Sequence, residues 1–231
     1  MSANQTDSGT VLKVQDLGKQ VSSPEGQLTI LDSVSFDVSQ GEIVALVGPS
    51  GAGKTTLLAL LAGLDRPTSG DVVLCDESLN GLTEDGRAEL RGRHVGFVFQ
   101  SFHLVASLTA LENVMLPLEL SESSDAAARA REVLENVGLG PRTGHYPRQL
   151  SGGEKQRVAI ARAFVTSPSV LFADEPTGNL DTASGDRIID LLFELNRLSG
   201  TTLVLVTHDK ELAARCDRVL ELEAGRLLQE D

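Results

Sequence analysis

Residues 48–55 (GPSGAGKT) connect a wholly apolar run, Ile43–Val47, to a segment with leucines at helical spacing, residues 54–62. The loop fits the pattern GxxxxGK[ST], in which glycines let backbone N–H groups turn inward around phosphate oxygens. The helix start behind the loop adds a partial positive charge that favours anions. This strand–loop–helix unit predicts an α/β fold with a phosphate-binding site.

The prediction extends to single residues of the loop. We expect Lys54 to contact the β- and γ-phosphates of ATP, Thr55 to offer its hydroxyl to Mg²⁺, and Thr56 to reach the α-phosphate. A chance glycine-rich turn is the alternative, and the flanking strand and helix argue against it. The residues expected to bind ATP here are Gly48, Pro49, Ser50, Gly51, Ala52, Gly53, Lys54, Thr55 and Thr56.

A second apolar run, residues 170–173, ends in two acids, Asp174 and Glu175. In ATPases with a phosphate loop, an acid at the carboxyl end of a neighbouring strand holds Mg²⁺, and we assign that role to Asp174. Glu175 follows one residue later, where it can polarise an attacking water as a general base. A pair of solvated acids at a strand end is the alternative, which the loop at 48–55 disfavours.

Strand and helix patterns alternate along much of the chain. Residues 11–17 and 28–38 alternate apolar and polar side chains, which predicts half-exposed strands separated by a loop at 22–26. Residues 203–206 form a short apolar run that predicts another buried strand, and residues 182–198 carry an amphipathic helical pattern. This alternation is typical of a layered α/β core.

Residues 101–150 contain no strong strand pattern, and a helical lobe is expected there. This stretch includes an Ala/Glu/Arg-rich helix over residues 125–137 that Gly138 ends. A hairpin with a glycine turn is expected at residues 219–228. We therefore predict a single domain over residues 11–228, with the lobe inserted at about 101–150 and a flexible tail at 1–10.

The formal charge of −13 over 231 residues gives no overall basic footprint for nucleic acid or anionic lipid. Hydrophobic residues make up 41%, so a substantial core can be buried. Cys75 and Cys216 stand alone and are interpreted as thiols of a reducing compartment. No apolar stretch approaches the roughly 20 residues that a membrane span needs. A membrane-spanning part would therefore belong to another chain.

Further segments resemble motifs of the ATP-binding-cassette (ABC) ATPases. LSGGE at residues 150–154 resembles their signature motif, in which Ser151 can cap the following helix. His208 resembles the switch histidine that senses the γ-phosphate, and Gln100 resembles the Q-loop glutamine that contacts Mg²⁺ or the water. The signature residues that would bind ATP across a dimer are Ser151, Gly152, Gly153 and Glu154. The residues that resemble the D-loop at the dimer interface are Asn179, Leu180 and Asp181.

The resemblance covers about residues 11–228 and implies a complete architecture. It implies a RecA-like phosphate-loop NTPase core with an N-terminal antiparallel β-subdomain and an inserted helical subdomain. It also implies a head-to-tail dimer of two copies, with two ATP molecules between residues 48–55 of one chain and 151–154 of the other. Catalysis is assigned to Glu175, His208, Gln100 and Lys54. Mg²⁺ is assigned to Thr55, Gln100 and Asp174.

The run ADEPTGNLD at residues 173–181 resembles the lipoprotein-release and macrolide-export branch of the family. This implies a Mg²⁺-dependent ATPase, bound through an integral-membrane permease to the cytoplasmic face of the inner membrane. Pumping a substrate through a channel and transmitting motion to periplasmic parts of the permease both stay open. The branch favours the second, including extraction of hydrophobic or lipid-like substrates from the membrane.

We expect the permease to dock near residues 100–120. The candidate contact residues are Phe102, His103, Leu104 and Leu108. Packing inside the lobe is the alternative for these side chains, and the sequence leaves both open.

Two other functions compete with the transport reading. ABC ATPases that act on DNA or ribosomes usually have long coiled-coil insertions or two cassettes in tandem, and this chain has one short lobe and an acidic balance. A non-hydrolysing, ATP-binding scaffold at the membrane is disfavoured because Asp174, Glu175 and His208 are all present.

One position departs from the family pattern. Most ABC ATPases carry an aromatic residue after the first strand that stacks on adenine, and Val21 occupies that place here. No Tyr, Phe or Trp occurs in residues 1–30. Stacking of a base on an aromatic ring contributes about 1–3 kcal/mol in other nucleotide sites. We therefore predict a weak preference for adenine over guanine, with Val21 packing only partly offsetting the loss.

Overall fold

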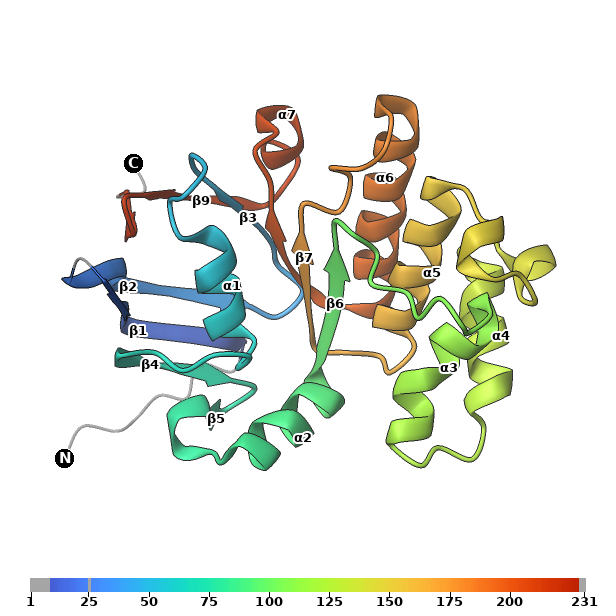
Figure 1. Ribbon diagram of the computed structural model, residues 1–231, viewed down its shortest axis with the longest axis horizontal. Coiled ribbons are helices and arrows are strands. Elements are labelled where there is room, and N and C mark those ends of the chain that lie inside the picture. The colour runs from blue at the N-terminus through green and yellow to red at the C-terminus, as the bar shows by residue number, and fades with distance from the viewer. Residues whose placement is uncertain (1–8, 25, 229–231) are drawn as a thin grey trace.

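The computed structural model describes residues 9–24 and 26–228 (Figure 1). Most of the predicted tail at residues 1–10 lies outside the described residues, and its flexibility stays a prediction. The described chain has two sheets and a group of helices to one side (Figure 1). This arrangement of a RecA-like core, an antiparallel β-subdomain and a helical subdomain confirms the predicted α/β class.

The first sheet has the strand order β2-β1-β4-β5 and is antiparallel throughout. Its strands are β1 (Thr10–Ser23), β2 (Gly26–Ser39), β4 (Ser69–Leu74) and β5 (Glu77–Ser78). The two predicted strands are therefore longer than expected, and they include Ser22, Ser23 and Gly26 of the predicted loop at 22–26. Ser22 pairs with Gln27. Backbone pairing continues beyond the alternating pattern because it does not require apolar side chains.

The second sheet has the order β10-β9-β3-β8-β7-β6, and only the β9–β10 pair is antiparallel. Its strands are β3 (Ile43–Val47), β6 (Val95–Phe99), β7 (Val170–Asp174), β8 (Thr202–Val206), β9 (Arg218–Glu223) and β10 (Arg226–Leu227). The buried strands predicted at 43–47, 170–173 and 203–206 are present. They align with their carboxyl ends at one edge of the sheet.

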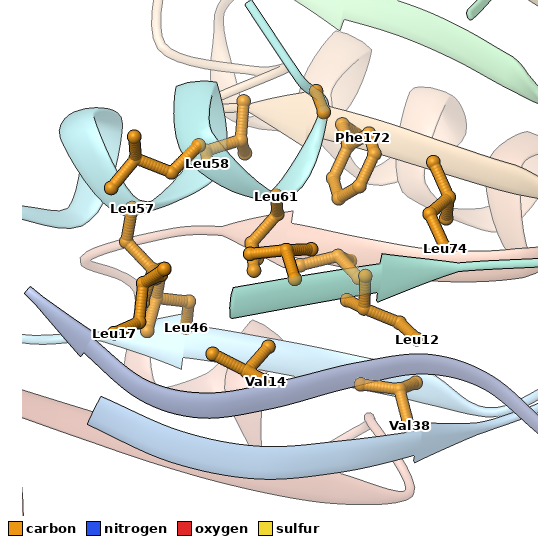
Figure 2. Packing of buried hydrophobic residues seen from close by; sticks show 14 of the residues in the cluster. Leu12, Val14, Leu17, Val38, Leu46, Leu57, Leu58, Leu61, Leu74 and Phe172 are labelled. Atoms are coloured by element: carbon orange, nitrogen blue, oxygen red, sulfur yellow. The ribbon is translucent and has the colours of Figure 1, made fainter. Parts of the chain in front are cut away.

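Helix α1 (Lys54–Leu61) lies between the two sheets (Figure 1). Figure 2 shows its leucines beside Val14 and Leu17 of β1, with Phe172 of β7 at the other side of the cluster. These side chains are almost wholly buried. Burial of apolar surface contributes roughly 25 cal/mol per Å², so this cluster fixes the position of α1 and of the loop before it.

The other face of the parallel sheet is covered by α5 (Gly152–Phe164) and α6 (Thr182–Ser199). The helix predicted at 182–198 is thus present, and it presents its apolar stripe to the sheet. Gly200 ends it in the left-handed conformation, with φ of 67°. The remaining short elements on the core are a 3₁₀ turn (Leu79–Gly81), α2 (Glu84–His94) and α7 (Lys210–Ala213).

The helical lobe contains α3 (Ala110–Leu120) and α4 (Ala126–Asn136), followed by two 3₁₀ turns, Gly140–Arg142 and Pro147–Gln149. A third buried cluster joins α3 and α4 to Val158, Ala161 and Val165 at α5. Helix α5 therefore packs against both the lobe and the sheet. We propose residues 101–150 as the inserted lobe, with α5 completing its core.

Candidate functional site

The loop between β3 and α1 has a backbone that only glycine can adopt at two of its positions. Gly48 has φ of 147°, and a Cβ there would lie 2.1 Å from the Leu222 carbonyl oxygen. Gly53 has φ of 102°, and its Cβ would lie 3.0 Å from the carbonyl oxygen of Ile30. The glycines of the sequence pattern are therefore required by close backbone approach as well as by conformation.

Helix α1 begins at this loop without a side-chain cap. Its N-cap is Gly53, and no side-chain cap is found for its first turn within the described part of the chain. The Lys54 ammonium donates to the carbonyl oxygens of Gly48 and Pro49, at 2.8 and 2.9 Å. Open amides at a helix N-terminus with an ammonium beside them match the needs of a phosphate group. The loop thus fits the triphosphate of ATP.

A cavity of about 470 Å³ joins the loop to the ends of two neighbouring strands. Its lining residues are Ile30, Gly48, Ser50, Gly51, Gly53, Lys54, Thr55, Thr56, Glu175, Val206 and His208. The structure therefore brings Glu175 and His208 to the phosphate loop, although these segments are more than 100 residues apart in sequence. Ile30 and Val206 were not identified from the sequence, because their local patterns are those of ordinary strand residues.

Glu175 is held in an unusual conformation at the mouth of this cavity. It has φ of 45°, and its N–H donates to the Val206 carbonyl at 3.0 Å. Its Oε1 lies 3.3 Å from Nδ1 of His208, whose side chain is 73% exposed. A non-glycine residue with positive φ is costly, and such strain is concentrated at functional sites. Glu175 and His208 can therefore act on one water molecule.

Asp174, the last residue of β7, lies behind the loop. Burial raises the pKa of Asp174, and the charge of Glu175 raises it further, while a hydrogen bond with the Thr55 side chain and the charge of Lys54 lower it. The Thr55 hydroxyl and the Asp174 carboxylate are therefore neighbours. Hydroxyl and carboxylate oxygens are hard ligands of the kind that Mg²⁺ prefers, so this pair fits the predicted ion.

Gln100 follows β6 and contacts the predicted D-loop. Its carbonyl oxygen accepts a hydrogen bond from Nδ2 of Asn179 at 2.9 Å. A Cβ on Gly178 would lie 2.5 Å from Nε2 of Gln100. The sequence assigned Asn179 to a dimer interface and did not indicate this contact within the chain, because the two segments meet only through the pairing of β6 with β7.

The predicted signature segment lies elsewhere, at the start of α5 beside α6 (Figure 1). Ser151 caps α5 by accepting from the Glu154 N–H at 3.3 Å, and the Ser151 N–H donates to Glu154 Oε2 at 2.8 Å. These hydrogen bonds and the Arg142 ion pair at 2.9 Å lower the pKa of Glu154 to about 2. None of the four signature residues lines the cavity at the phosphate loop.

The D-loop residues lie directly before α6. Asp181 accepts a hydrogen bond from the Ser184 N–H at 3.0 Å and is the N-cap of that helix. A Cβ on Gly152 would lie 3.2 Å from the Leu180 side chain, so the signature segment and the D-loop are in contact. Asn179, Leu180 and Asp181 are at least partly exposed. Their accessibility keeps a role at an interface open.

Val21 lies near the turn of the β1–β2 hairpin and is 38% exposed. It pairs with Leu28, two residues before Ile30 of the cavity wall. The residues that line the cavity include no aromatic side chain. The structure therefore offers no ring for a base at this cavity among its described residues.

The candidate docking residues follow Gln100 on the way to the lobe. Leu104 packs against the buried cluster of the lobe, which supports the lobe-core alternative for that side chain. His103 is exposed, and its ring meets Phe99 edge-on with centroids 4.9 Å apart. Phe102 and Leu108 are partly buried. These four side chains therefore do not form a continuous exposed surface.

Comparisons with known proteins agree with this geometry. Residues 31–178 match the family model described as ABC transporter. The chain is 57% identical to the ABC transporter ATP-binding protein YbbA of Escherichia coli K12, over 95% of this chain and 97% of YbbA. It is 48% identical to the lipoprotein-releasing system ATP-binding protein LolD of Xanthomonas campestris pv. campestris strain 8004, covering 98% of this chain and 96% of LolD.

Solved structures give the same result. The chain resembles the ATP-binding cassette MJ0796, solved as a dimer in a post-hydrolysis state with ADP and Pi, with a TM-score of 0.87 and 39% identity. The match covers 95% of this chain and 97% of that one. The cbiO1 subunit of Clostridium perfringens, part of an ABC transporter complex, matches with a TM-score of 0.85 and 28% identity over 96% of this chain and 88% of cbiO1.

Proposed function

Because this chain belongs to the ABC transporter ATP-binding family, we propose that it hydrolyses ATP as one half of a dimer and thereby drives a separate membrane permease. The observation that carries the proposal is the cavity in which the phosphate loop, Glu175 and His208 meet. Binding groups for a triphosphate and a candidate base for water are thus combined in one chain.

The proposed reaction begins with binding of the triphosphate at the start of α1. The open amides and Lys54 hold the β- and γ-phosphates. Mg²⁺ held by Thr55, Gln100 and Asp174 would neutralise charge on the phosphate oxygens. Glu175 would accept a proton from the water as its oxygen bonds to the γ-phosphorus, while the bond between the β- and γ-phosphates breaks and ADP leaves from phosphate. His208 would orient Glu175 and the water through the contact at 3.3 Å.

A second copy of the chain completes the site in this proposal. The signature residues lie at the start of α5, outside the cavity, and the Ser151 N–H and hydroxyl are already paired with Glu154. Their glycines remain free to approach a nucleotide carried by another chain. The dimeric assembly of MJ0796 with ADP and Pi supports an arrangement of two chains. ATP would close the dimer by binding the closed state more tightly than the open one.

The permease is proposed to dock in a groove of about 570 Å³ between α2, β6, α3 and α5. Its apolar wall includes Phe97, Phe99, Leu116, Pro117 and Leu120, and Leu120 is 79% exposed. This location shifts the proposed contact surface away from Leu104 and toward the second half of residues 100–120. An amphipathic cytoplasmic helix of a YbbP-like permease would suit such a groove.

Similarity to YbbA and LolD supports a permease as partner, with this chain peripheral to the cytoplasmic face of the inner membrane. Within the part of the chain that the structure describes, no helix is both long and apolar enough to cross a membrane. LolD belongs to a lipoprotein-releasing system, and similarity to it supports mechanical extraction of lipid-like cargo over pumping through a channel. The permease would determine the cargo.

Replacing the candidate base tests the proposed function. We expect Glu175→Gln to reduce phosphate release by at least about 10²-fold, because a positioned general base contributes about 10²–10⁴-fold. The variant should still bind ATP and accumulate as a dimer in gel filtration. Glu132→Gln, at an exposed position of α4, is the matched control and should hydrolyse ATP like the wild type.

Two outcomes would contradict the proposal. Wild-type turnover by Glu175→Gln would show that Glu175 is not the base. Absence of turnover in the wild-type chain, measured with its permease in membranes, would favour a non-hydrolysing scaffold at the membrane.

A further inference from the structure

The segment after Gln100 has an unusual backbone. Phe102 and His103 are consecutive non-glycine residues with φ of 60° and 47°. Each lies in the left-handed region, which is unfavourable for residues that carry a Cβ. Such a pair persists only where neighbouring groups hold it.

Arg162 of α5 holds both carbonyl groups of this backbone, whose N–H groups donate to Phe99 and Ser101. Its Nη1 donates to the His103 carbonyl oxygen at 2.6 Å, and its Nη2 donates to the Phe102 carbonyl oxygen at 3.0 Å. Burial lowers the pKa of Arg162. Among the described residues, no carboxylate lies within ion-pair distance of Arg162. The planar guanidinium group thus donates to two successive carbonyl groups.

The same segment is fastened at its other end by the D-loop. The Gln100 carbonyl accepts from Asn179, so residues 100–103 are held between two elements. Phe99, the residue before this segment, and Arg162 both line the docking groove. The ring of His103 packs edge-on against Phe99. Arg162 therefore contacts the Gln100 segment and the groove at once.

We propose that Arg162 is a positioning residue that links movement of α5 and occupancy of the groove to the placement of Gln100. This inference rests on the proposed ATPase function, because Gln100 acts only if ATP and Mg²⁺ bind. Arg162 lies 11 residues after Ser151 on one continuous helix, or about 16 Å at 1.5 Å per residue. If the start of α5 moves, the continuous helix moves Arg162 with it, and Arg162 moves the carbonyl groups of Phe102 and His103 that it binds.

A rigid brace without any effect on Gln100 is the competing explanation, and a double-mutant cycle separates the two. The variants are Arg162→Lys, Gln100→Ala and the combination, in the full chain. Lysine keeps the charge but lacks the fork that reaches two carbonyl oxygens. Arg129→Lys is the control, because Arg129 of α4 donates to the Ser167 hydroxyl at 2.7 Å, outside this segment.

The readouts are kcat and the Mg²⁺ concentration that gives half-maximal ATP binding. We expect both Arg162→Lys and Gln100→Ala to lower kcat by about tenfold and to raise the required Mg²⁺ concentration severalfold. The combined variant should be no worse than Gln100→Ala alone, and Arg129→Lys should match the wild type. Losses that multiply in the combined variant, or an unchanged Mg²⁺ requirement in Arg162→Lys, would overturn the proposal.

A second variant tests the same link if Arg162→Lys fails to fold. His103→Gly leaves the guanidinium intact but frees the strained backbone and removes the ring from Phe99. It should lower kcat severalfold in the wild-type background and have no effect in Gln100→Ala. An equal loss in both backgrounds would contradict the proposal. Wild-type turnover in the same assay distinguishes these failures from failure of the ATPase proposal itself.

Discussion

The starts of α1 and α5 are two helix N-termini built in opposite ways. Helix α1 begins at a left-handed glycine with no side-chain cap, and its first turn opens into the cavity that Glu175 and His208 share. Helix α5 begins at Ser151, in a capping box with Glu154. One helix start is left unsatisfied by its own chain and needs a ligand, while the other is already satisfied.

The difference teaches how a composite site can be divided between two copies. In the proposed function, the uncapped terminus would supply the binding energy for the triphosphate in a single chain, because the helix dipole and Lys54 would act there together. The capped terminus keeps its geometry before any nucleotide arrives. It is therefore suited to recognise a nucleotide that another chain already holds.

The largest expected effects come from one substitution at each terminus. The substitution at α1 should weaken ATP binding, and the substitution at α5 should slow hydrolysis. We expect Lys54→Ala to weaken ATP binding by the monomer by about 10²-fold or more, because the ammonium contacts the phosphates directly in the proposed site. Ser151→Ala should leave monomer affinity within about twofold while lowering dimer-dependent hydrolysis about 10²-fold. Isothermal titration and a phosphate-release assay measure the two quantities. Loss of monomer affinity in Ser151→Ala would break the comparison.

A smaller effect concerns the base end of the nucleotide, which only the α1 cavity would meet. We expect the wild type to bind ATP and GTP within about fivefold of each other, because no aromatic side chain of the described residues lines that cavity. Val21→Tyr should tighten ATP binding roughly 5–150-fold, the range that about 1–3 kcal/mol of stacking gives. Val219→Tyr, at an equally exposed valine of β9, is the control. Strong ATP selectivity in the wild type would contradict this prediction.

The smallest expected effect is on stability. Neutralising Asp174 beside the start of α1 and neutralising Glu154 at the start of α5 should change the melting temperature in opposite directions. The pKa of Asp174 is raised above its ordinary value of 3.8, chiefly by burial, so its ionisation opposes folding. Asp174→Asn should therefore raise the melting temperature of the nucleotide-free protein by a few degrees at pH 7. This gain should develop as the pH rises through 3.8 toward the folded-state pKa, and vanish well below it.

At the start of α5, ionisation of the carboxyl group has the opposite effect on stability. The pKa of Glu154 is lowered from 4.5 to about 2, chiefly by its hydrogen bonds with Ser151, so its ionised form stabilises the fold. That contribution is complete above pH 4.5 and is lost as the pH falls through about 2. Glu154→Gln should lower the melting temperature at pH 7, and calorimetry on both variants compares them. Shifts of the same sign would refute the electrostatic difference between the two termini.

Local sequence patterns predicted the parts of the site that are contiguous in the chain. The strand, loop and first helix around residues 48–55 were predicted in place, because glycine spacing and an apolar run specify them locally. The longer hairpin of β1 and β2 was missed, since exposed polar residues pair by backbone groups that leave no side-chain pattern. The contact of Asn179 with Gln100 was missed because it joins segments 79 residues apart.

The sequence by itself determined that a phosphate-binding loop, two acids at a strand end and a glycine-rich helix start are present. Each depends on residue types at fixed local spacing, which one stretch of chain can encode. Only the tertiary structure decided that Glu175 and His208 reach the loop, that the signature residues do not, and that Arg162 holds the Gln100 segment. Strand order and helix packing set those distances, and they arise from the burial of the whole core.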